Sequence, residues 1–455
     1  MQMPIRLLAL AASVLALTPS AAAFCGFYVA KADATLFNRS SKVVVARKDQ
    51  RTVVTMASDY AGDPKEFALV VPVPTVVRRE HIRITSNGLI DHLDAYTAPR
   101  LVEYFDPDPC APQTAFTAAL SLAELSRQQA RPAPGRHAAA LGVKIEAQYT
   151  VGEYDVLILS AKQSDGLSTW LTEEGYRIPS GAAPVLGSYI KQGMKFFVAK
   201  VNLEEKSRLG FHYLRPIQVA YDTHKFMLPI RLGTVNADGP QDMVVLMLTE
   251  RGRVETTNYR TQRIPSNINL PIFTKSDFAA FYKALFDTQV KYDGMKAVYL
   301  EYAWNVAWCD PCAADPIPND KLVELGAFWL SGQRTNASSR GEGKLATPTQ
   351  PANAFITRLH VRYDGQNFPE DLMFQETADT DVFQGRYVLN HPFRGPTSCP
   401  AGEQYRNTLR DRFAREAVTL AHLTGWDPRA IADRMRSTGH SLPVRPPPAS
   451  NPQQP

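Results

Sequence analysis

The feature that most constrains the fold is a run of alternating apolar and polar residues at positions 143–151. Its apolar members are Val143, Ile145, Ala147, Tyr149 and Val151, and its polar members are Lys144, Glu146, Gln148 and Thr150. Because successive side chains of a strand point to opposite faces, this pattern predicts a strand with one buried and one solvated face. Gly152-Glu153 fits a two-residue turn, and the apolar run 154–159 predicts a central strand that returns beside the first.

Strand patterns recur along most of the chain. A hairpin is predicted at 43–56, and in the strand predicted at 66–73 Pro72 and Pro74 remove donors from one edge, so we expect that edge to lack a normal partner. Further strands are predicted at 195–201, 217–221, 226–230, 243–249, 254–258, 296–307, 355–363 and 385–390. Helices are predicted after Ser164 or Asp165, after Ser276, from Tyr405 to Gly425, and from Asp427.

These patterns predict an α+β fold that is predominantly antiparallel β-sheet with attached helices and a helical C-terminal segment. The chain divides into a signal peptide, a β-rich N-terminal region, an α+β C-terminal region and a proline-rich tail predicted to be disordered. We place these four segments at 1–23, 24–258, 259–440 and 441–455, with an Ala/Pro-rich insertion near 113–140.

The N-terminus has the pattern of an export signal. Arg6 precedes an apolar run at 7–17, and the small residues at 21–23 form a cleavage site just before Phe24. The alternative is a short buried helix. The signal peptide predicts a periplasmic or secreted protein in an oxidising compartment, and no later segment is apolar enough to cross a membrane.

Charge and motifs exclude several function classes. Fifty Lys and Arg against 45 Asp and Glu give a formal charge of +5, spread without long blocks, which gives no support to nucleic-acid binding. The sequence has no Gly-x-Ser-x-Gly, His-Glu-x-x-His, phosphate-binding loop or dinucleotide fingerprint. We therefore expect no cofactor and no metal, and an enzyme becomes the less favoured class.

Five cysteines remain after signal cleavage: Cys25, Cys110, Cys309, Cys312 and Cys399. An odd number leaves at least one thiol free or intermolecular, and the sequence cannot choose among the possible pairings. The Cys309-x-x-Cys312 spacing is typical of thiol-disulfide exchange, but Pro316 and Pro318 would cut short the helix that such a site needs. Structural disulfides are the favoured interpretation, and zinc would need two further ligands.

Two clusters are candidates for ligand binding. Arg358, His360 and Arg362 alternate along a predicted strand, so they share a face that could hold a carboxylate or phosphate. The alternative is a solvated face neutralised by acids such as Glu370 and Asp371.

The second cluster is aromatic. Tyr302, Trp304 and Trp308 lie on a predicted strand, with both tryptophans expected on one face, where they could bind sugar rings or a partner. Core packing is the alternative that we favour.

A family resemblance rests on stretches spread from the mature N-terminus to about residue 395. They are FCGFYV at 24–29, FALVVPVP at 67–74, VGEYDV at 151–156, EYAW at 301–304 with CDPC at 309–312, TRLHVRY at 357–363 and FPEDL at 368–372. With them the chain resembles the bacterial DUF2330 family, a domain of unknown function. The resemblance implies an exported envelope protein and carries over no activity, ligand or catalytic residue.

The leading hypothesis is an exported, non-enzymatic envelope protein that acts in binding or as a scaffold and is braced by disulfides. Its partner would be an envelope protein or a small anionic or glycan ligand. The competing hypothesis is a periplasmic thiol-disulfide oxidoreductase with Cys309 as nucleophile and Cys312 as resolving thiol.

Overall fold

The computed structural model describes most of the chain between residues 27 and 439. The described ranges are 27–31, 37–61, 67–111, 144–162, 164–173, 176–178, 181–209, 214–235, 237, 239–308, 317–331 and 353–439. The predicted signal peptide, the insertion near 113–140 and the tail at 441–455 lie outside them. So do Cys25, Cys309 and Cys312.

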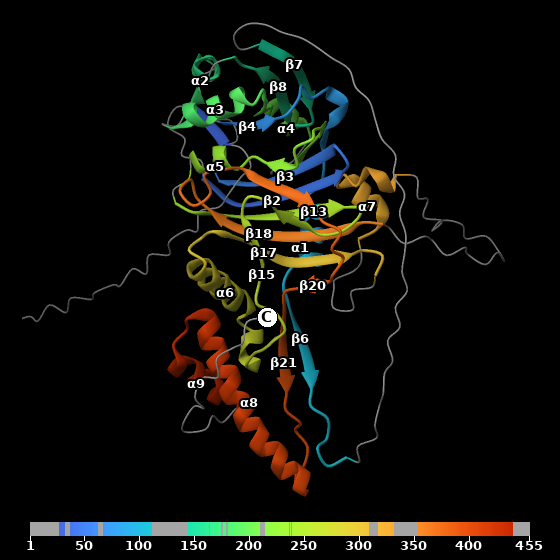
Figure 1. Cartoon of the computed structure of the whole chain (residues 1–455), viewed down its shortest axis with the longest axis vertical. Coiled ribbons are helices and arrows are strands. Elements are labelled where there is room, and N and C mark those ends of the chain that lie inside the picture. The colour runs from blue at the N-terminus through green and yellow to red at the C-terminus, as the bar shows by residue number, and fades with distance from the viewer. Residues whose placement is uncertain are drawn as a thin grey trace, which may run out of the picture.

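The described residues form three levels along the long axis of the molecule (Figure 1). The upper level is a six-stranded sheet, in the order β7 (Lys144–Val151), β8 (Tyr154–Ser160), β10 (Lys195–Val201), β4 (Phe67–Val73), β1 (Phe27–Lys31) and β9 (Tyr176–Arg177). Its outer face is covered by α2 (Ser164–Glu173) and α3 (Ala182–Lys191), whose apolar side chains pack on the strands. A short helix, α4 (Leu203–Leu209), follows β10.

The middle level is a nine-stranded sheet that takes strands from both predicted regions. Its order is β15 (Arg260–Arg263), β17 (Ala297–Asn305), β18 (Phe355–Tyr363), β13 (Gln241–Thr249), β2 (Phe37–Lys48), β3 (Arg51–Ala61), β11 (Ile217–Asp222) and β5 (Ile82–Ile84), with β20 (Phe383–Gln384) paired to β17. One face packs against the upper sheet around a large apolar core. The other face is covered by α1 (Asn87–Thr97), α6 (Phe278–Tyr292) and α7 (Asn319–Glu324).

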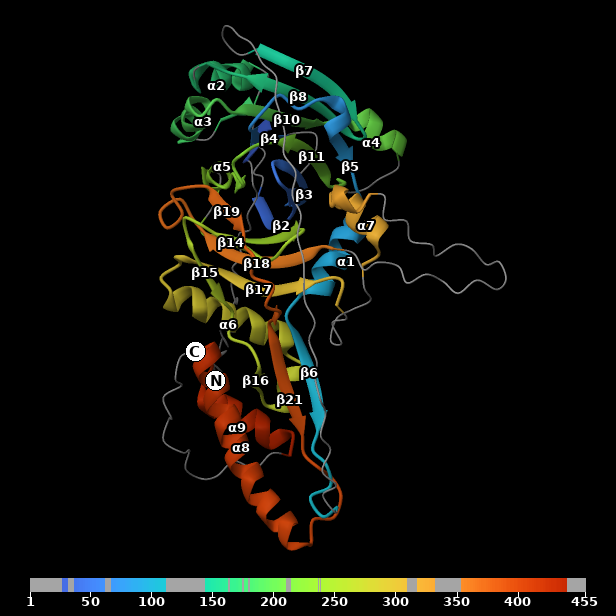
Figure 2. The same cartoon turned by 45° about the vertical axis from the view of Figure 1, so that its right-hand side comes forward.

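The lower level is narrow. Three strands, β16 (Ile268–Asn269), β21 (Arg386–His391) and β6 (Arg100–Phe105), lie beside the helices α8 (Pro400–Thr424) and α9 (Pro428–Ser437). Figure 2 shows α8 running from the far end of this level back towards α6. Apolar residues of α6, α8 and α9 share one core with β17 and β21, so α6 joins the lower level to the central sheet.

A small three-stranded sheet lies beside the core between the two large sheets. It consists of β12 (Met227–Leu228), β19 (Leu372–Glu376) and β14 (Val254–Thr256), and α5 (Arg231–Val235) follows β12.

The predicted α+β class is confirmed. Both hairpins form, β2 with β3 and β7 with β8, and their strand pairing is antiparallel. The long C-terminal helix ends at Gly425, whose φ of 68° is the left-handed conformation that favours glycine at this position. Among the described strands four pairings are parallel, β13 with β2, β15 with β17, β16 with β21 and β21 with β6, and the local patterns did not predict them.

Several predicted boundaries need correction. The strands expected at 226–230 and 254–258 shrink to β12 and β14, and the helix expected after Ser276 begins at Phe278 with Asp277 at its N-cap. β4 is also a central strand, because β10 pairs with it as far as Val73 and places Phe196 opposite Pro72. On its other side β4 pairs with β1, and the described pairing runs from Phe67 to Val70.

The turn between β7 and β8 is fixed by a buried ion pair. Gly152 takes a φ of 55°, and Glu153 is fully buried. The Glu153 carboxylate accepts hydrogen bonds from the Arg215 backbone N–H at 2.8 Å and from Arg215 Nη2 at 2.7 Å. A buried carboxylate is tolerated when cationic and N–H donors surround it in this way. Glu153 therefore ties the upper sheet to the segment that leads into β11.

We expect Glu153→Gln to lower the free energy of unfolding by about 2 to 3 kcal/mol, because it breaks the buried ion pair between Glu153 and Arg215. Urea denaturation at pH 7 measures the change. Glu205→Gln is the matched control, since Glu205 pairs with Arg208 on the surface of α4, and we expect a change below about 0.5 kcal/mol. Equal effects of the two substitutions would contradict this account.

Candidate functional site

The site begins with an irregularity in β17. The register between β17 and β18 shifts between Leu300 and Tyr302, so Glu301 is an extra residue in the pairing. A bulge of this kind redirects a side chain that strict alternation would place elsewhere. Glu301 lies two residues after Tyr299, so it shares the strand face of Tyr299, which carries Arg358 and His360, and the bulge turns Tyr302 to that face as well.

Glu301 is fully buried and is the centre of an ionic network. Arg358 Nε donates to its Oε2 at 2.6 Å, His360 Nδ1 lies 2.7 Å from its Oε1, and the Tyr282 hydroxyl donates to the same Oε1. Burial alone would raise the pKa of this carboxyl, but His360 and Arg358, with the hydrogen bonds from His360 and Tyr282, outweigh it and lower the pKa to about 2. Glu301 is therefore held as a carboxylate.

The network continues from the sheet into α1. Arg358 Nη1 donates to Asp94 Oδ1 at 2.5 Å and to Thr97 Oγ1 at 3.2 Å, both on α1. Asp94 also binds Lys42 of β2 at 2.7 Å. Burial alone would raise the pKa of Asp94. Arg358 and Lys42 outweigh burial, so this pKa lies below its ordinary value. One buried guanidinium thus links α1 to β17.

The same strand face reaches α6 through His360 and Arg362. The Phe286 ring of α6 stacks on His360 with a centroid separation of 3.7 Å, and the Arg362 guanidinium lies 5.2 Å from the same ring. Arg362 binds both carboxylate oxygens of Asp242 at 2.7 Å and Asp287 of α6 at 2.7 Å. These contacts fix α6 against β18 and β13.

A cavity of about 550 Å³ opens where Arg362 meets α6. Its charged lining consists of Arg362, Asp242, Lys283, Asp287 and Lys291. Its remaining lining is mostly apolar and is contributed by Pro240, Val290, Gly294 and Met295, with Asn367 beside them. An open cavity with an apolar wall and a few charged groups is the usual form of a small-ligand site.

The three candidates on this strand face therefore have different environments. Arg358 is 7% exposed and His360 is largely buried, and both are bound to Glu301, whereas Arg362 lines the cavity. The prediction that Glu370 and Asp371 neutralise this strand face is wrong. Asp371 accepts hydrogen bonds from the Tyr189 hydroxyl and from backbone N–H groups at residues 230 and 231. The Glu370 side chain accepts one from Asn258, so neither acid neutralises this strand face.

The two tryptophans do not share a strand face. β17 ends at Asn305, so Trp308 lies in the following turn and is 63% exposed. Trp304 is partly buried, donates from Nε1 to the Trp308 carbonyl at 3.2 Å and stacks near the fully buried Tyr302. Tyr302 packs edge-on against Tyr96 of α1, which is core packing.

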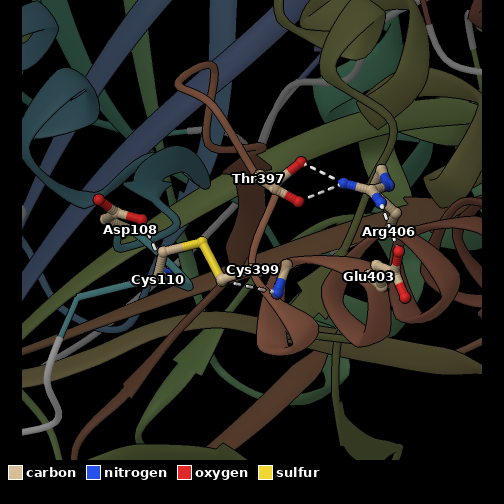
Figure 3. Close-up of a disulfide and its surroundings, with 7 residues drawn as sticks. Asp108, Cys110, Thr397, Cys399, Glu403 and Arg406 are labelled. Atoms are coloured by element: carbon tan, nitrogen blue, oxygen red, sulfur yellow. Dashed lines mark hydrogen bonds and ion pairs between the residues drawn. A yellow bond between two sulfur atoms is a disulfide. The ribbon is translucent and has the colours of Figure 1, made fainter.

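A disulfide joins Cys110 to Cys399 across 289 residues, with a Sγ–Sγ distance of 2.08 Å. It links the loop after β6 to the N-cap of α8, as Figure 3 shows. A second tie lies close by in the chain: Asp106 accepts hydrogen bonds from the Tyr405 hydroxyl at 2.5 Å and from Arg412 Nη1 at 2.8 Å. A covalent link and an ionic link thus join the segment after β6 to α8.

Sequence patterns missed the acids that complete the site and the lysines of the cavity. Glu301 belongs to the EYAW stretch, but its partners Arg358 and His360 lie on another strand far along the chain, so no local pattern specified the contact. Lys283, Asp287 and Lys291 recur every four residues along the predicted helix, and this spacing was the available signal for a polar face at the cavity.

Two further findings concern only the described part of the chain. None of its helices has the length and apolar character needed to span a membrane. It also brings together no group of three or more His, Cys, Asp or Glu residues that could hold a metal ion.

We expect Glu301→Gln to lower the free energy of unfolding at pH 7 by about 3 to 5 kcal/mol, because it removes one of the two carboxylates that neutralise the buried Arg358 charge. The folded pKa of Glu301, about 2, lies below the ordinary value of 4.5. Its stabilisation is therefore present above pH 4.5 and is lost as the pH falls towards 2, so the wild type and the variant converge in acid.

Denaturant unfolding at pH 7 and pH 3 measures both effects. The control is Asp91→Asn, which removes the outermost and 65% exposed acid of the same network. We expect that control to change stability by less than about 1 kcal/mol. A cost at pH 7 no larger for Glu301→Gln than for Asp91→Asn would refute the structural role of Glu301.

Glu416 of α8 gives the lower level a different pH dependence. Its side chain is buried, and burial raises its pKa to about 8 even though Arg412, 3.7 Å away, opposes the shift. Because the folded pKa exceeds the ordinary value of 4.5, the associated stability is full below pH 4.5 and is lost as the pH rises through 8. We expect Glu416→Gln to be more stable than the wild type at pH 9 by about 2 to 4 kcal/mol.

That advantage is expected to disappear at pH 5, as measured by urea midpoints at the two pH values. Glu403→Gln on the exposed face of the same helix is the control and is expected to change neither midpoint. An unchanged difference between Glu416→Gln and the wild type at pH 5 and pH 9 would exclude titration of Glu416 in this range.

Comparison with known proteins identifies the family only. Neither a curated protein nor a solved structure matches the chain. The family of uncharacterized proteins conserved in bacteria (DUF2330) matches residues 19–375, which include the central sheet strands β17 and β18, Glu301 and the cavity lining. Helices α8 and α9 follow the matched part. The chain therefore belongs to the DUF2330 family.

Proposed function

We propose that the chain is an exported, non-enzymatic binding protein of the cell envelope that holds a small anionic ligand in the cavity beside Arg362. The cavity and its charges carry the proposal. The signal-peptide pattern at 1–23 and the Cys110–Cys399 disulfide support an oxidising compartment outside the cytoplasm.

The charge balance of the cavity favours an anion. Three cationic side chains, Arg362, Lys283 and Lys291, face two carboxylates, Asp242 and Asp287, which leaves one formal positive charge. Arg362 is held by both carboxylates, and Lys283 binds Asp287 at 2.7 Å. Within the described ranges Lys291 has no ion-pair partner, and its side chain is exposed. Lys291 is thus the cation available to a ligand.

The shape of the cavity adds a second requirement. Val290, Met295 and Pro240 form an apolar wall beside the charged groups. A ligand that combines one carboxylate or phosphate with a compact apolar part would satisfy both. The Glu301 network supports binding over catalysis, because its carboxylate is buried, paired and held ionised, which leaves it no proton to exchange near neutral pH.

Calorimetric titration with phenyl phosphate, inorganic phosphate and glucose tests the proposal. We expect phenyl phosphate to bind more tightly than phosphate, and neutral glucose to show no binding. Lys291→Gln is expected to weaken phenyl phosphate binding about tenfold, which corresponds to ~1.4 kcal/mol. Lys191→Gln, a change at an exposed lysine at the end of α3, is the control and is expected to bind like the wild type.

Absence of phosphate or phenyl phosphate binding at millimolar concentrations would refute the anion site. Binding of glucose that survives in Lys291→Gln would instead favour the glycan alternative. Equal affinities in the wild type and Lys291→Gln would place any binding outside this cavity.

A further inference from the structure

We infer that the Cys110–Cys399 disulfide is an exchange site for a dithiol protein of the Cys-x-x-Cys type, with Cys110 as the sulfur attacked and Cys399 as the leaving thiolate. This inference does not depend on the proposed ligand. It rests on access to the bridge, on the different surroundings of its two sulfurs and on the ionic link beside it.

The bridge is accessible to another protein. Cys399 is the N-cap of α8, and the N-terminal end of α8 lies at the far end of the lower level, away from both large sheets (Figure 2). Cys110 is exposed, and so are the neighbouring positions 107, 108 and 111, whereas Cys399 is partly buried. An attacking thiolate must approach along the line of the two sulfurs, and the exposed side of the bridge is that of Cys110.

The two sulfurs differ in their ability to carry negative charge. Cys399 is the N-cap of a 25-residue helix, and its Sγ accepts a hydrogen bond from the Gly402 N–H at 3.2 Å (Figure 3). This position stabilises a thiolate through the unpaired N–H groups and the helix dipole. Cys110 follows Asp108, whose carboxylate accepts the Cys110 backbone N–H at 2.8 Å. A nearby carboxylate disfavours a thiolate, so Cys399 is the better leaving group.

Reduction of the disulfide is expected to free the loop segments next to Cys110 and Cys399 and to leave β6, β21 and α8 folded. Asp106 lies before the bridge and holds α8 through Tyr405 and Arg412 without any covalent link. The β6–β21 pairing continues to residues 105 and 391, and the Asp106 N–H donates to the His391 carbonyl at 2.9 Å. Only the short segments between Asp106 and Cys110, and between His391 and α8, gain freedom.

The exchange balances in two steps. The partner thiolate forms a bond to Cys110 Sγ, the Cys110–Cys399 bond breaks, and Cys399 leaves as a thiolate that can take up a proton. The second thiolate of the partner then attacks the partner sulfur that is bonded to Cys110, which forms the partner disulfide and releases Cys110 as a thiolate. The two cysteines of this chain are reduced, and the partner dithiol is oxidised to a disulfide.

Trapping with a thioredoxin-type protein whose resolving cysteine is replaced by serine tests the inference. The substrate is the variant Cys25→Ser/Cys309→Ser/Cys312→Ser, which retains only the bridge. Free thiols are alkylated, and the mixed disulfide is mapped by peptide mass spectrometry. We expect the mixed disulfide to be found on Cys110 at least fivefold more often than on Cys399. The same mapping on the wild-type chain, which reads every cysteine separately, applies if the triple variant does not fold.

Two further measurements complete the design. Asp108→Asn is expected to reduce the ratio of trapping on Cys110 to trapping on Cys399, because it removes the carboxylate beside Cys110. Hydrogen exchange of the reduced protein is expected to accelerate at 107–111 and 392–403 while β17 and β18 keep their protection. A trap found mainly on Cys399, a bridge that reacts only after denaturation, or global unfolding on reduction would each overturn the inference.

Discussion

The structure depends on placing one carboxylate, that of Glu301, where water cannot reach it. Such a group is stable in a protein interior only with cations and donors around it. Arg358, His360 and Tyr282 supply them from β18 and α6, and Arg358 reaches on to Asp94 of α1. Of the helices on this face of the central sheet, α1 and α6 are therefore positioned by one buried charge as well as by apolar packing.

The cavity lies at one end of the same row of side chains. Arg358, His360 and Arg362 follow one another along β18, from the buried middle of the strand to its end near α6. Stacking of Phe286 on His360 and the contact of Asp287 with Arg362 fix the helix that carries Lys283 and Lys291. The buried part of the row thus acts as the support, and its outer end forms the lining that a ligand can contact.

Local patterns were sufficient for most of the secondary structure. The alternation at 143–151 and the apolar stripe at 278–286 are set by neighbours in the chain, and the hairpin and helix follow from them. Parallel pairings such as β13 with β2, and the Cys110–Cys399 bridge, join residues about 200 and 289 positions apart, respectively, so no local pattern specifies them.

The candidate site was predictable only in part. The shared face of Arg358, His360 and Arg362 follows from strand periodicity, but the carboxylates that pair with it, on Glu301, Asp242 and Asp287, come from distant segments. The pairing expected for Glu370 and Asp371 failed because nearness in sequence was a poor guide to contact across a sheet. Trp304 and Trp308 do not share a strand face, because β17 ends three residues before Trp308.

The central claim is that the charge on Glu301 holds α1 and α6 on the sheet. Native-state hydrogen exchange on the wild type and Glu301→Gln tests it most directly, because it reports opening free energies element by element. The account predicts that protection falls in α1 and α6 together, by more than in β8 and β10 of the upper sheet. Unchanged protection of the two helices, or a loss equal in all four elements, would contradict it.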